Sequence, residues 1–533
     1  MRVKRLFASL LCLFLLASCA GCTDKPATGG DGAGTTPGPQ STLGAPGVET
    51  PADTADPAPT YQETIRIGIN AEPSTVLTPT KSTSAMCQMI ARSTHSTLLD
   101  LDLETGEIAG DLAQDWSVSE DGTVYTFKLH EGVKFSNGEE CTAEDVKYTL
   151  EQRVPNGALA SLVTSIVSIE AVDAYTVKIT LSGAVQDMKY TLAGPACSIV
   201  CKSAVEAGGD EGERYGTGAY SITEYVQGEY VLLTRNENYF GQMPNTKFLK
   251  FVVYLEDSTR QLALETGEIE VCYSPANSDL VYIQANEELD LISCTGVNIY
   301  YIGFNTQAEP FDNEKVRQAV ACAVNKQDAI TVAFDGYAEV ATNVMAPAIP
   351  LYQEVSVWDY DVERAKALMT EAGYENGFQT TVWVDRADEE QMAVLFKENL
   401  KAIGIDLEIV RLEATTLKAK WGDDDYRMCI QKFGNTGGPG ISFSYVFAST
   451  AAANRSRIND PRVDEMIAAA AVEQDSKVRS DMYKQLNEYI TTTAYWVPVC
   501  IPQVFVGTKT GLEGAKYSGN TSHDFTYACL AEP

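Results

Sequence analysis

The chain has 533 residues, of which 44% are hydrophobic and 21% charged, so it is long enough for two or three lobes with sizeable cores. Its formal net charge of -33 at pH 7 would repel a phosphate backbone and matches an anionic membrane surface poorly. Composition therefore argues against nucleic acid and lipid headgroups as main partners, and the acidity itself favours solubility.

The first residues have the pattern of a secretory signal peptide. Basic residues within the first five positions precede the apolar run Leu6–Ala17, which is too short to span a bilayer. The run is followed by Ser18 and Cys19, and the residues from Leu16 to Cys19 resemble the bacterial lipobox. We therefore expect a signal peptide over 1–18 and lipidation of Cys19. Ordinary cleavage beside an incidental cysteine is the alternative, and Cys22 is a weaker second candidate.

The segment that follows has the composition of a tether. It holds no aromatic residue from Thr23 to Thr60 and is rich in Gly, Pro, Thr, Ala and Asp. Such a segment cannot bury enough apolar surface to fold. Residues 19–60 are therefore predicted to be a disordered, lipidated tether, and no later stretch of about 18 apolar residues predicts a membrane span.

The first half of the body predicts strands and one capped helix. Residues 65–70 alternate as a strand does, and 115–129 reads as a hairpin turning at Asp121 and Gly122. Thr142 is placed to cap a helix, with Asp145 three residues on. Further strands are expected at 175–181, 230–234 and 248–255.

The second half predicts mostly helices with glycine ends. The expected helices are 258–264, 315–324 with Asp312 and Asn313 as caps, 362–372, 394–403 and 479–491, and a strand is expected at 406–411. This irregular alternation indicates mixed α/β lobes.

Several motifs in this order carry a resemblance to a known family. The first are GDLAQDW at 110–116, EDGTVYTF at 120–127, GVKF at 132–135 and TAEDV at 142–146. GTGAY at 216–220, NENYF at 236–240 and GEIE at 267–270 follow. The succession is similar to that of the family 5 solute-binding proteins of ABC importers, the oligopeptide, dipeptide and nickel receptors. The likeness extends from about 65 to 502, although Trp116, Tyr125, Phe127 and Arg317 read as structural residues.

The resemblance implies an α/β, periplasmic-binding-protein-like fold in which a hinged ligand cleft lies between lobes. It implies a discontinuous lobe I of residues 61–94, 169–275 and 500–533, an inserted lobe II of 95–168 and a lobe III of 276–499. Ligand would be enclosed between lobes I and III as they close about the hinge.

The family's peptide receptors carry an aspartate in a lobe III loop that pairs with the peptide's amine, and this chain departs from that pattern. The corresponding stretch is 432–443, where Thr436 takes the aspartate's place, and no Asp or Glu occurs from 427 to 459. A carboxylate from elsewhere would have to substitute, or the ligand lacks an amine. The resemblance suggests these substrate contacts: Ser82, Thr83, Ser84, Phe433, Gly434, Asn435, Thr436 and Phe443. The phenylalanines could equally pack in a core, and the glycine-rich loop could be a plain turn.

Other classes of function find little support. Three histidines, no nucleophile or P-loop motif, and cysteines without metal spacing argue against an enzyme, a metal site or a cofactor. The expected function is that of a monomeric lipoprotein that delivers a solute, a peptide by resemblance, to ABC permease subunits with cytoplasmic ATPases. It would be anchored to the outer face of the cell membrane, in the periplasm if there are two membranes. The alternatives are a receptor for a non-peptide solute or metal chelate, and a peptide-signal receptor without import.

Overall fold

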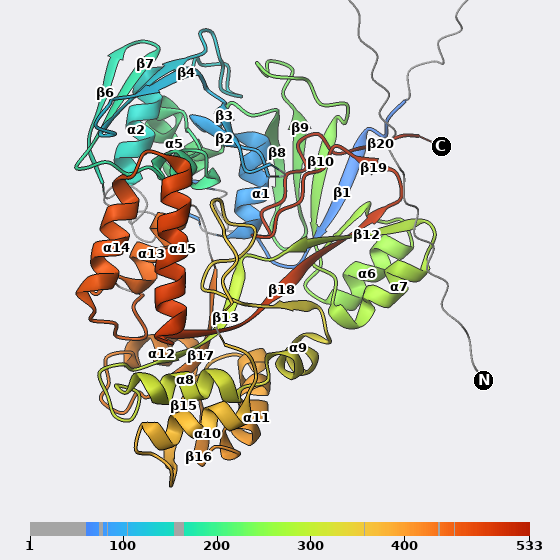
Figure 1. Ribbon diagram of the computed structural model, residues 1–533. Coiled ribbons are helices and arrows are strands. Elements are labelled where there is room, and N and C mark those ends of the chain that lie inside the picture. Colours follow the sequence, from blue (N-terminus) through green and yellow to red (C-terminus); the bar gives the residue numbers. More distant parts are fainter. Residues whose placement is uncertain are drawn as a thin grey trace, which may run out of the picture. The chain divides into compact units, whose positions relative to one another are not determined.

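The computed structural model describes residues 60–73, 78–82, 84–103, 105–153, 165–356, 358–434, 438–451 and 453–532. Their strands form a 12-stranded sheet, a 4-stranded sheet and two 2-stranded sheets, with helices packed around them (Figure 1). The expected lipidation site Cys19 and the tether predicted at 19–60, apart from its last residue, lie outside these residues.

The long sheet has the strand order β16-β15-β17-β13-β18-β11-β1-β10-β9-β8, and β12 and β14 also pair with β18. Its strands are β1 (Thr64–Ile69), β8 (Tyr220–Val226), β9 (Tyr230–Arg235), β10 (Phe248–Val253), β11 (Val271–Tyr273), β12 (Leu289–Thr295), β13 (Asn298–Phe304), β14 (Ala338–Val340), β15 (Phe378–Val384), β16 (Ile405–Arg411), β17 (Met428–Gly434) and β18 (Trp496–Lys509).

Strand β18 lies in the middle of this sheet and joins its two halves. Its first residues, from Trp496 to Cys500, pair with β13, and its residues 503–509 pair with β12. Figure 1 shows β18 as a long dark-red strand that runs from β13 and β17 toward β12. The border expected between residues 499 and 500 therefore falls inside one continuous strand.

The 4-stranded sheet has the order β4-β5-β7-β6. Its strands are β4 (Ala113–Val118), β5 (Val124–Leu129), β6 (Ile166–Asp173) and β7 (Thr176–Leu181). The predicted hairpin is confirmed, with Gly122 at φ +69° in its turn. The sheet also continues past the border expected between residues 168 and 169, because β7 pairs with β5 and buries Val177, Ile179 and Leu181 against the same core.

The longer helices, each of seven residues or more, are α1 (Ala85–Thr94), α2 (Ala143–Arg153), α5 (Lys202–Gly208), α6 (Asp257–Glu265), α8 (Glu314–Ala323), α9 (Lys326–Phe334), α10 (Val362–Glu371), α11 (Ala387–Lys401), α12 (Ala414–Lys420), α13 (Pro439–Phe447), α14 (Pro461–Val472) and α15 (Ser476–Thr492). Shorter elements are α4 (Met188–Leu192), α7 (Leu280–Ala285), the 3-10 turns at 195–197, 209–214 and 277–279, and the strands β2 (Leu99–Leu101), β3 (Ile108–Gly110), β19 (Leu512–Glu513) and β20 (Cys529–Leu530).

Capping chemistry predicted from the sequence is present at two helices. The backbone N–H and the hydroxyl of Thr142 donate to Asp145 Oδ2 at 2.9 and 3.0 Å, just before α2. The side chain of Asn313 accepts the N–H of Lys315 at 3.0 Å at the start of α8. Arg317 donates to backbone carbonyls, including that of Phe311 at 2.8 Å, which confirms its structural role.

Helix α11 begins at Ala387, seven residues before the start predicted at Val394. Acidic residues fill its first turn, where they complement the helix dipole. The Glu389 carboxylate also accepts the N–H of Arg386, the residue that precedes the helix, at 3.3 Å. These local interactions extend the helix beyond the apolar periodicity on which the prediction rested.

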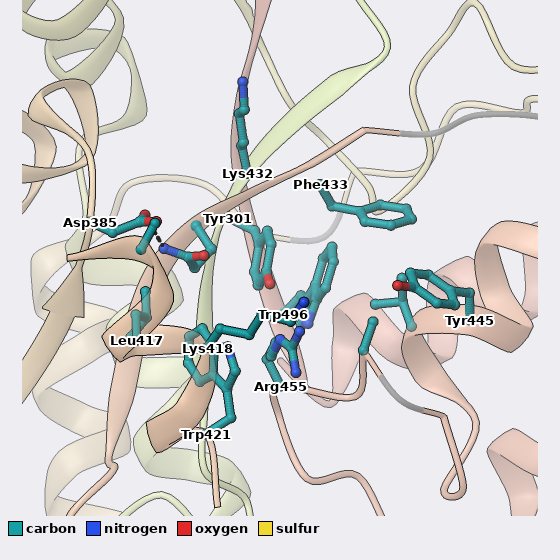
Figure 2. Close-up of a pocket in the computed structure, with 14 residues that line it drawn as sticks. Tyr301, Asp385, Leu417, Lys418, Trp421, Lys432, Phe433, Tyr445, Arg455 and Trp496 are labelled. Carbon is teal, nitrogen blue, oxygen red and sulfur yellow. Dashed lines mark hydrogen bonds between the residues drawn. The ribbon is translucent and has the colours of Figure 1, made fainter. Parts of the chain in front are cut away.

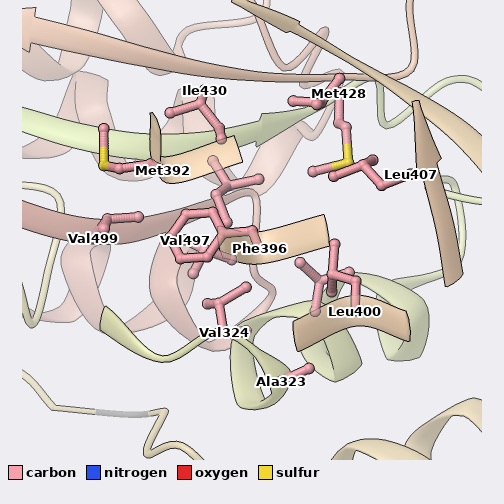
Figure 3. Close-up of a cluster of buried hydrophobic side chains, with 14 of the residues drawn as sticks. Ala323, Val324, Met392, Phe396, Leu400, Leu407, Met428, Ile430, Val497 and Val499 are labelled. Carbon is pink, nitrogen blue, oxygen red and sulfur yellow. The ribbon is translucent and has the colours of Figure 1, made fainter. Parts of the chain in front are cut away.

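The part of the long sheet around β13 is buried on both faces. Ile302 of β13, Ile430 of β17 and Val497 of β18 face the apolar cluster, which also includes Ala323, Val324, Met392, Phe396, Leu400, Leu407, Met428 and Val499 (Figure 3). Their sequence neighbours Tyr301 and Trp496 face a second cluster on the opposite side. Alternation along the strands therefore separates two surfaces of different composition.

Three hydrogen bonds join the helices after β17 to residues near the 4-stranded sheet. Gly440 at the start of α13 donates its N–H to Asp187 Oδ2 at 2.6 Å. Gln474 Nε2 donates to the carbonyl of Glu120 at 2.6 Å, and the N–H of Gln186 donates to the carbonyl of Ala471 at 3.3 Å. The segment from β17 to α15 therefore touches a part of the chain far from it in sequence.

Candidate ligand pocket

A cavity of about 260 Å³ lies on the side of β13, β17 and β18 that faces away from the apolar cluster (Figure 2). The residues that line it are Tyr301, Asp385, Ala414, Leu417, Lys418, Trp421, Gln431, Lys432, Phe433, Tyr445, Val446, Ala453, Arg455 and Trp496. Its size is close to the lower end of small-molecule pockets, which starts at about 300 Å³.

Aromatic rings form one wall of the cavity. Tyr301 and Trp496 stack with ring centroids 3.4 Å apart and planes 6° apart. Phe433 meets Trp496 edge-on at 6.0 Å and lies 6.5 Å from Tyr445, whose side chain is 46% exposed. Tyr301 and Trp496 are buried, so the apolar surface of this wall that a solute can cover comes from Phe433 and Tyr445.

Two cations stand beside that wall. In Figure 2 the side chains of Lys418 and Arg455 extend toward Trp496. The Arg455 guanidinium lies 5.0 Å from the centre of the Trp421 ring, which holds it across that ring. Lys432 also borders the cavity, but Figure 2 shows its side chain leaving on the far side of the strand, as alternation from Phe433 requires.

One acid, Asp385, lines the cavity at the end of β15. Its Oδ1 accepts a hydrogen bond from Gln431 Nε2 at 3.0 Å, drawn as a dashed line in Figure 2. Both residues also donate hydrogen bonds to Glu389. Its Oε2 accepts one from the backbone N–H of Asp385 at 3.0 Å and one from Gln431 Nε2 at 3.1 Å. Burial raises the pKa of Glu389 to about 8, so this carboxyl holds a proton near neutral pH.

The indole N–H of Trp496 has no hydrogen-bond partner within the described part of the chain. The side chain is 1% exposed and borders the cavity. A buried donor without an acceptor costs about 1–3 kcal/mol. A solute that supplies an acceptor at this point would recover that energy.

The contacts suggested by the sequence are dispersed in the structure. Phe433 lines the cavity, and Gly434 ends β17 beside it. Phe443 is 2% exposed and stacks on Tyr483 at 5.5 Å, within the second cluster. Ser82 and Ser84 lie at the start of α1 and are not among the lining residues. Thr83, Asn435 and Thr436 lie outside the described residues, and the binding role of the whole set stays a prediction.

Sequence reasoning missed most of the charged and aromatic lining, notably Tyr301, Asp385, Lys418, Arg455 and Trp496. They come from five separate elements or loops, so no short motif contains them. The position of Asp385 is recognisable only in the structure, where it follows β15, which pairs in parallel with β16 and β17, and precedes α11. Ligands often bind at the carboxyl ends of such strands.

Within the described ranges, no three His, Cys, Asp or Glu side chains are grouped so that they could hold a metal ion. The helices of those ranges also include none with the length and apolar content that crossing a bilayer requires. The cysteines of the described residues are buried, apart from Cys294, which is partly exposed.

Residues 107–455 match the family described as bacterial extracellular solute-binding proteins, family 5 middle. The chain is 29% identical over 474 residues to the glutathione-binding protein GsiB of Escherichia coli K12, covering 86% of this chain and 92% of that protein.

Solved structures of other proteins have the same fold as this chain. HbpA2 of Haemophilus parasuis superposes with a TM-score of 0.80 at 26% identity, covering 88% of this chain and 100% of that one. DppA of Helicobacter pylori, a periplasmic binding protein solved with the peptide STSA, gives a TM-score of 0.73 at 25% identity over 89% and 99% of the two chains. The predicted mixed α/β, periplasmic-binding-protein fold is thereby confirmed.

Proposed function

The chain belongs to family 5 of the bacterial extracellular solute-binding proteins and is a substrate-binding protein of an ABC importer, and on that premise we propose that its solute is a small peptide or a peptide-like compound. Members of this family bind solutes and do not convert them, so the protein is not an enzyme.

The observation that carries the proposal is the distribution of charge in the cavity. Asp385 lies on one side, and Lys418 and Arg455 lie on another, with aromatic rings beside them. A small peptide has the complementary pattern of an ammonium, a carboxylate and apolar groups. The cavity volume of about 260 Å³ suits a few residues. The named ligands of relatives, glutathione for GsiB and a peptide for DppA, are of the same class.

Asp385 would replace the amine-anchoring aspartate that the loop after β17 lacks. It is the acidic member of the lining set, and its Oδ1 accepts from Gln431. A buried ammonium needs such a carboxylate, because desolvation without a partner costs several kcal/mol. The ligand's amine would then be bound by a carboxylate at the end of β15.

Capture would proceed by closure about a hinge, with lobe I at 61–94, 169–275 and 500–533, lobe II at 95–168 and lobe III at 276–499. A ligand shifts such an equilibrium by contacts made only in the closed state. The hydrogen bond from Gly440 to Asp187 would link proposed lobes III and I. Because α13 carries both Gly440 and the cavity residue Tyr445, this bond supports a coupling between ligand binding and the position of the lobes. The proposed anchor is a lipid on Cys19, which would hold the body at the outer face of the cell membrane, or in the periplasm if there are two membranes, beside ABC permease subunits with cytoplasmic ATPases.

Native mass spectrometry of the body over residues 60–533, purified from its host and again after incubation with tripeptides and glutathione, tests the solute class. We expect bound masses of peptides or peptide-like solutes, and a melting temperature that rises with their concentration. A co-purified sugar or metal chelate, with no response to either addition, would remove the peptide assignment while leaving the family unchanged.

A further inference from the structure

We propose that Lys418, Arg455 and the indole N–H of Trp496 form a carboxylate-binding subsite, and that the solute must present a carboxylate there to bind tightly. The inference rests on the proposed function, because it divides the same cavity into parts. It assigns the acidic group of the solute to one place and leaves the opposite side to Asp385.

The unpartnered donor of Trp496 is the first support. The indole is 1% exposed, and the ring is held on one face by Tyr301 at 3.4 Å and at its edge by Phe433 at 6.0 Å. Its N–H direction is therefore fixed by packing, and no described residue accepts from it. Indole nitrogen can only donate. The group that satisfies it must be an acceptor, and a carboxylate oxygen is the strongest acceptor that a peptide offers.

The two cations indicate that the acceptor is negatively charged. Lys418 comes from α12 and Arg455 from the loop after α13, and both line the same cavity as Trp496. The net charge of the chain is -33, so its overall field disfavours the approach of an anion. Lys418 and Arg455 beside the indole N–H of Trp496 would offset this repulsion of an anion within the cavity.

The ring of Trp421 makes the subsite more selective than a surface cation pair. It lies 5.0 Å from the Arg455 guanidinium and meets Tyr426 edge-on at 5.3 Å, so the aromatic support is itself packed. A guanidinium is planar and carries its N–H groups in a fork that matches both oxygens of a carboxylate. Lys418 is exposed and more mobile, and it adds charge with little geometry.

Acid-dependent affinity is the direct test. The probes are a tripeptide library with free carboxyl termini, the same library amidated, and glutathione beside its diethyl ester, which lacks both carboxylates, each titrated calorimetrically into the 60–533 body. Amidation or esterification should weaken binding about 10-fold to 100-fold, since a hydrogen bond to a charged group contributes about 1.5–3 kcal/mol. If amidated members that contain Asp or Glu still bind tightly, the carboxylate of a side chain occupies the same subsite.

Variants locate the effect. Lys418→Gln, Arg455→Gln and Trp496→Phe should each lower the ratio of acid affinity to amide affinity, with the largest drop for Arg455→Gln. General damage to the cavity would instead weaken acid and amide alike and leave the ratio unchanged. Lys401→Gln, a charge change on an exposed residue at the far end of α11, is the matched control and should preserve the ratio.

The outcomes separate the two proposals. Equal binding of acid and amide in the wild-type protein, or a ratio that the three variants leave unchanged, overturns the subsite while the peptide function stands. Failure of every peptide and of glutathione to bind overturns the peptide assignment, and the subsite falls with it. Because Trp496→Phe removes a buried donor from a packed strand, its melting temperature is measured first, and Arg455→Gln carries the test if it does not fold.

Discussion

The two faces of the sheet around β13 share the same strands but differ in what they bury. One face packs the apolar cluster, in which Val497 and Phe396 are 0% exposed and carry no polar atom (Figure 3). The other presents Tyr301, Trp496 and Phe433 to a cavity with charged side chains at its edge (Figure 2). Val497 and Trp496 are neighbours in β18, so one peptide bond separates a residue of the stabilising face from a residue of the proposed binding face.

This arrangement shows how ligand affinity can change through substitutions while the fold stays the same. Strand alternation places successive side chains on opposite faces, so a substitution on one face leaves the other in place. The free energy of folding and the free energy of binding should therefore respond to different residues of the same strands. Four substitutions test that separation.

The largest expected effect is on the apolar cluster. Phe396→Ala should lower the free energy of unfolding by about 3–5 kcal/mol, because it leaves a cavity among close-packed side chains. The affinity of the remaining folded protein for tripeptides should stay within about twofold, since only contacts on the far face are lost. Urea unfolding and calorimetric titration measure the two quantities.

Tyr445→Ala is the reciprocal control for Phe396→Ala. Its side chain is 46% exposed at the cavity, so stability should change by about 0.5 kcal/mol or less while tripeptide affinity falls. If both variants lost stability and affinity together, the two faces would not be energetically separate.

The next effect depends on pH and concerns Glu389, which supports the acidic side of the cavity. Its pKa is raised from 4.5 to about 8 in the folded protein by burial, so the folded state binds its proton more tightly than the unfolded state. Its contribution to stability is therefore complete below about pH 4.5 and is lost as pH rises toward 8, at up to about 1.4 kcal/mol per pH unit.

Replacing this carboxyl by an amide should remove that slope. Wild type should lose stability relative to Glu389→Gln between about pH 5.5 and pH 8.5, by about 3 kcal/mol at most. Urea midpoints at both pH values measure it, and the difference between the two proteins is the readout because Asp111, with a pKa raised to about 7, also titrates there. Parallel curves for wild type and variant would show that Glu389 is ionised throughout.

The smallest expected effect is at Lys432, which borders the cavity but directs its side chain to the other face. Lys432→Gln should change tripeptide affinity by less than about twofold, whereas Lys418→Gln lowers it. A loss at Lys432 equal to that at Lys418 would mean that both side chains reach the solute.

Local features of the fold could be predicted from the sequence, because they depend on neighbours in the chain. The turn at Gly122, the Thr142 and Asp145 cap and the family motifs are of this kind. The start of α11 could not be predicted from apolar periodicity, since charged residues rather than apolar ones define its first turn. The strand β18 was also missed as a single element, because its role depends on pairing with four other strands.

The site was less predictable than the fold. The resemblance places the amine anchor within residues 427–459, whereas Asp385 follows β15, a separate element. Phe433 was suggested and lines the cavity, while Phe443, ten residues on, turns into the second cluster. Both are phenylalanines near one loop, and only the packing of α13 against α14 and Tyr483 distinguishes them.

The continuity of β18 has a consequence for the order in which the molecule can be assembled. Strands β11, β12, β13 and β14 all pair with this strand, and it is synthesised after every one of them. The two halves of the long sheet are not joined until residues 496–509 leave the ribosome, so the sheet should not be completed during translation. A chain whose sheet closes only with its last long strand has a high contact order and should fold slowly. That delay would keep a polypeptide destined for export in a threadable state until its synthesis is nearly finished.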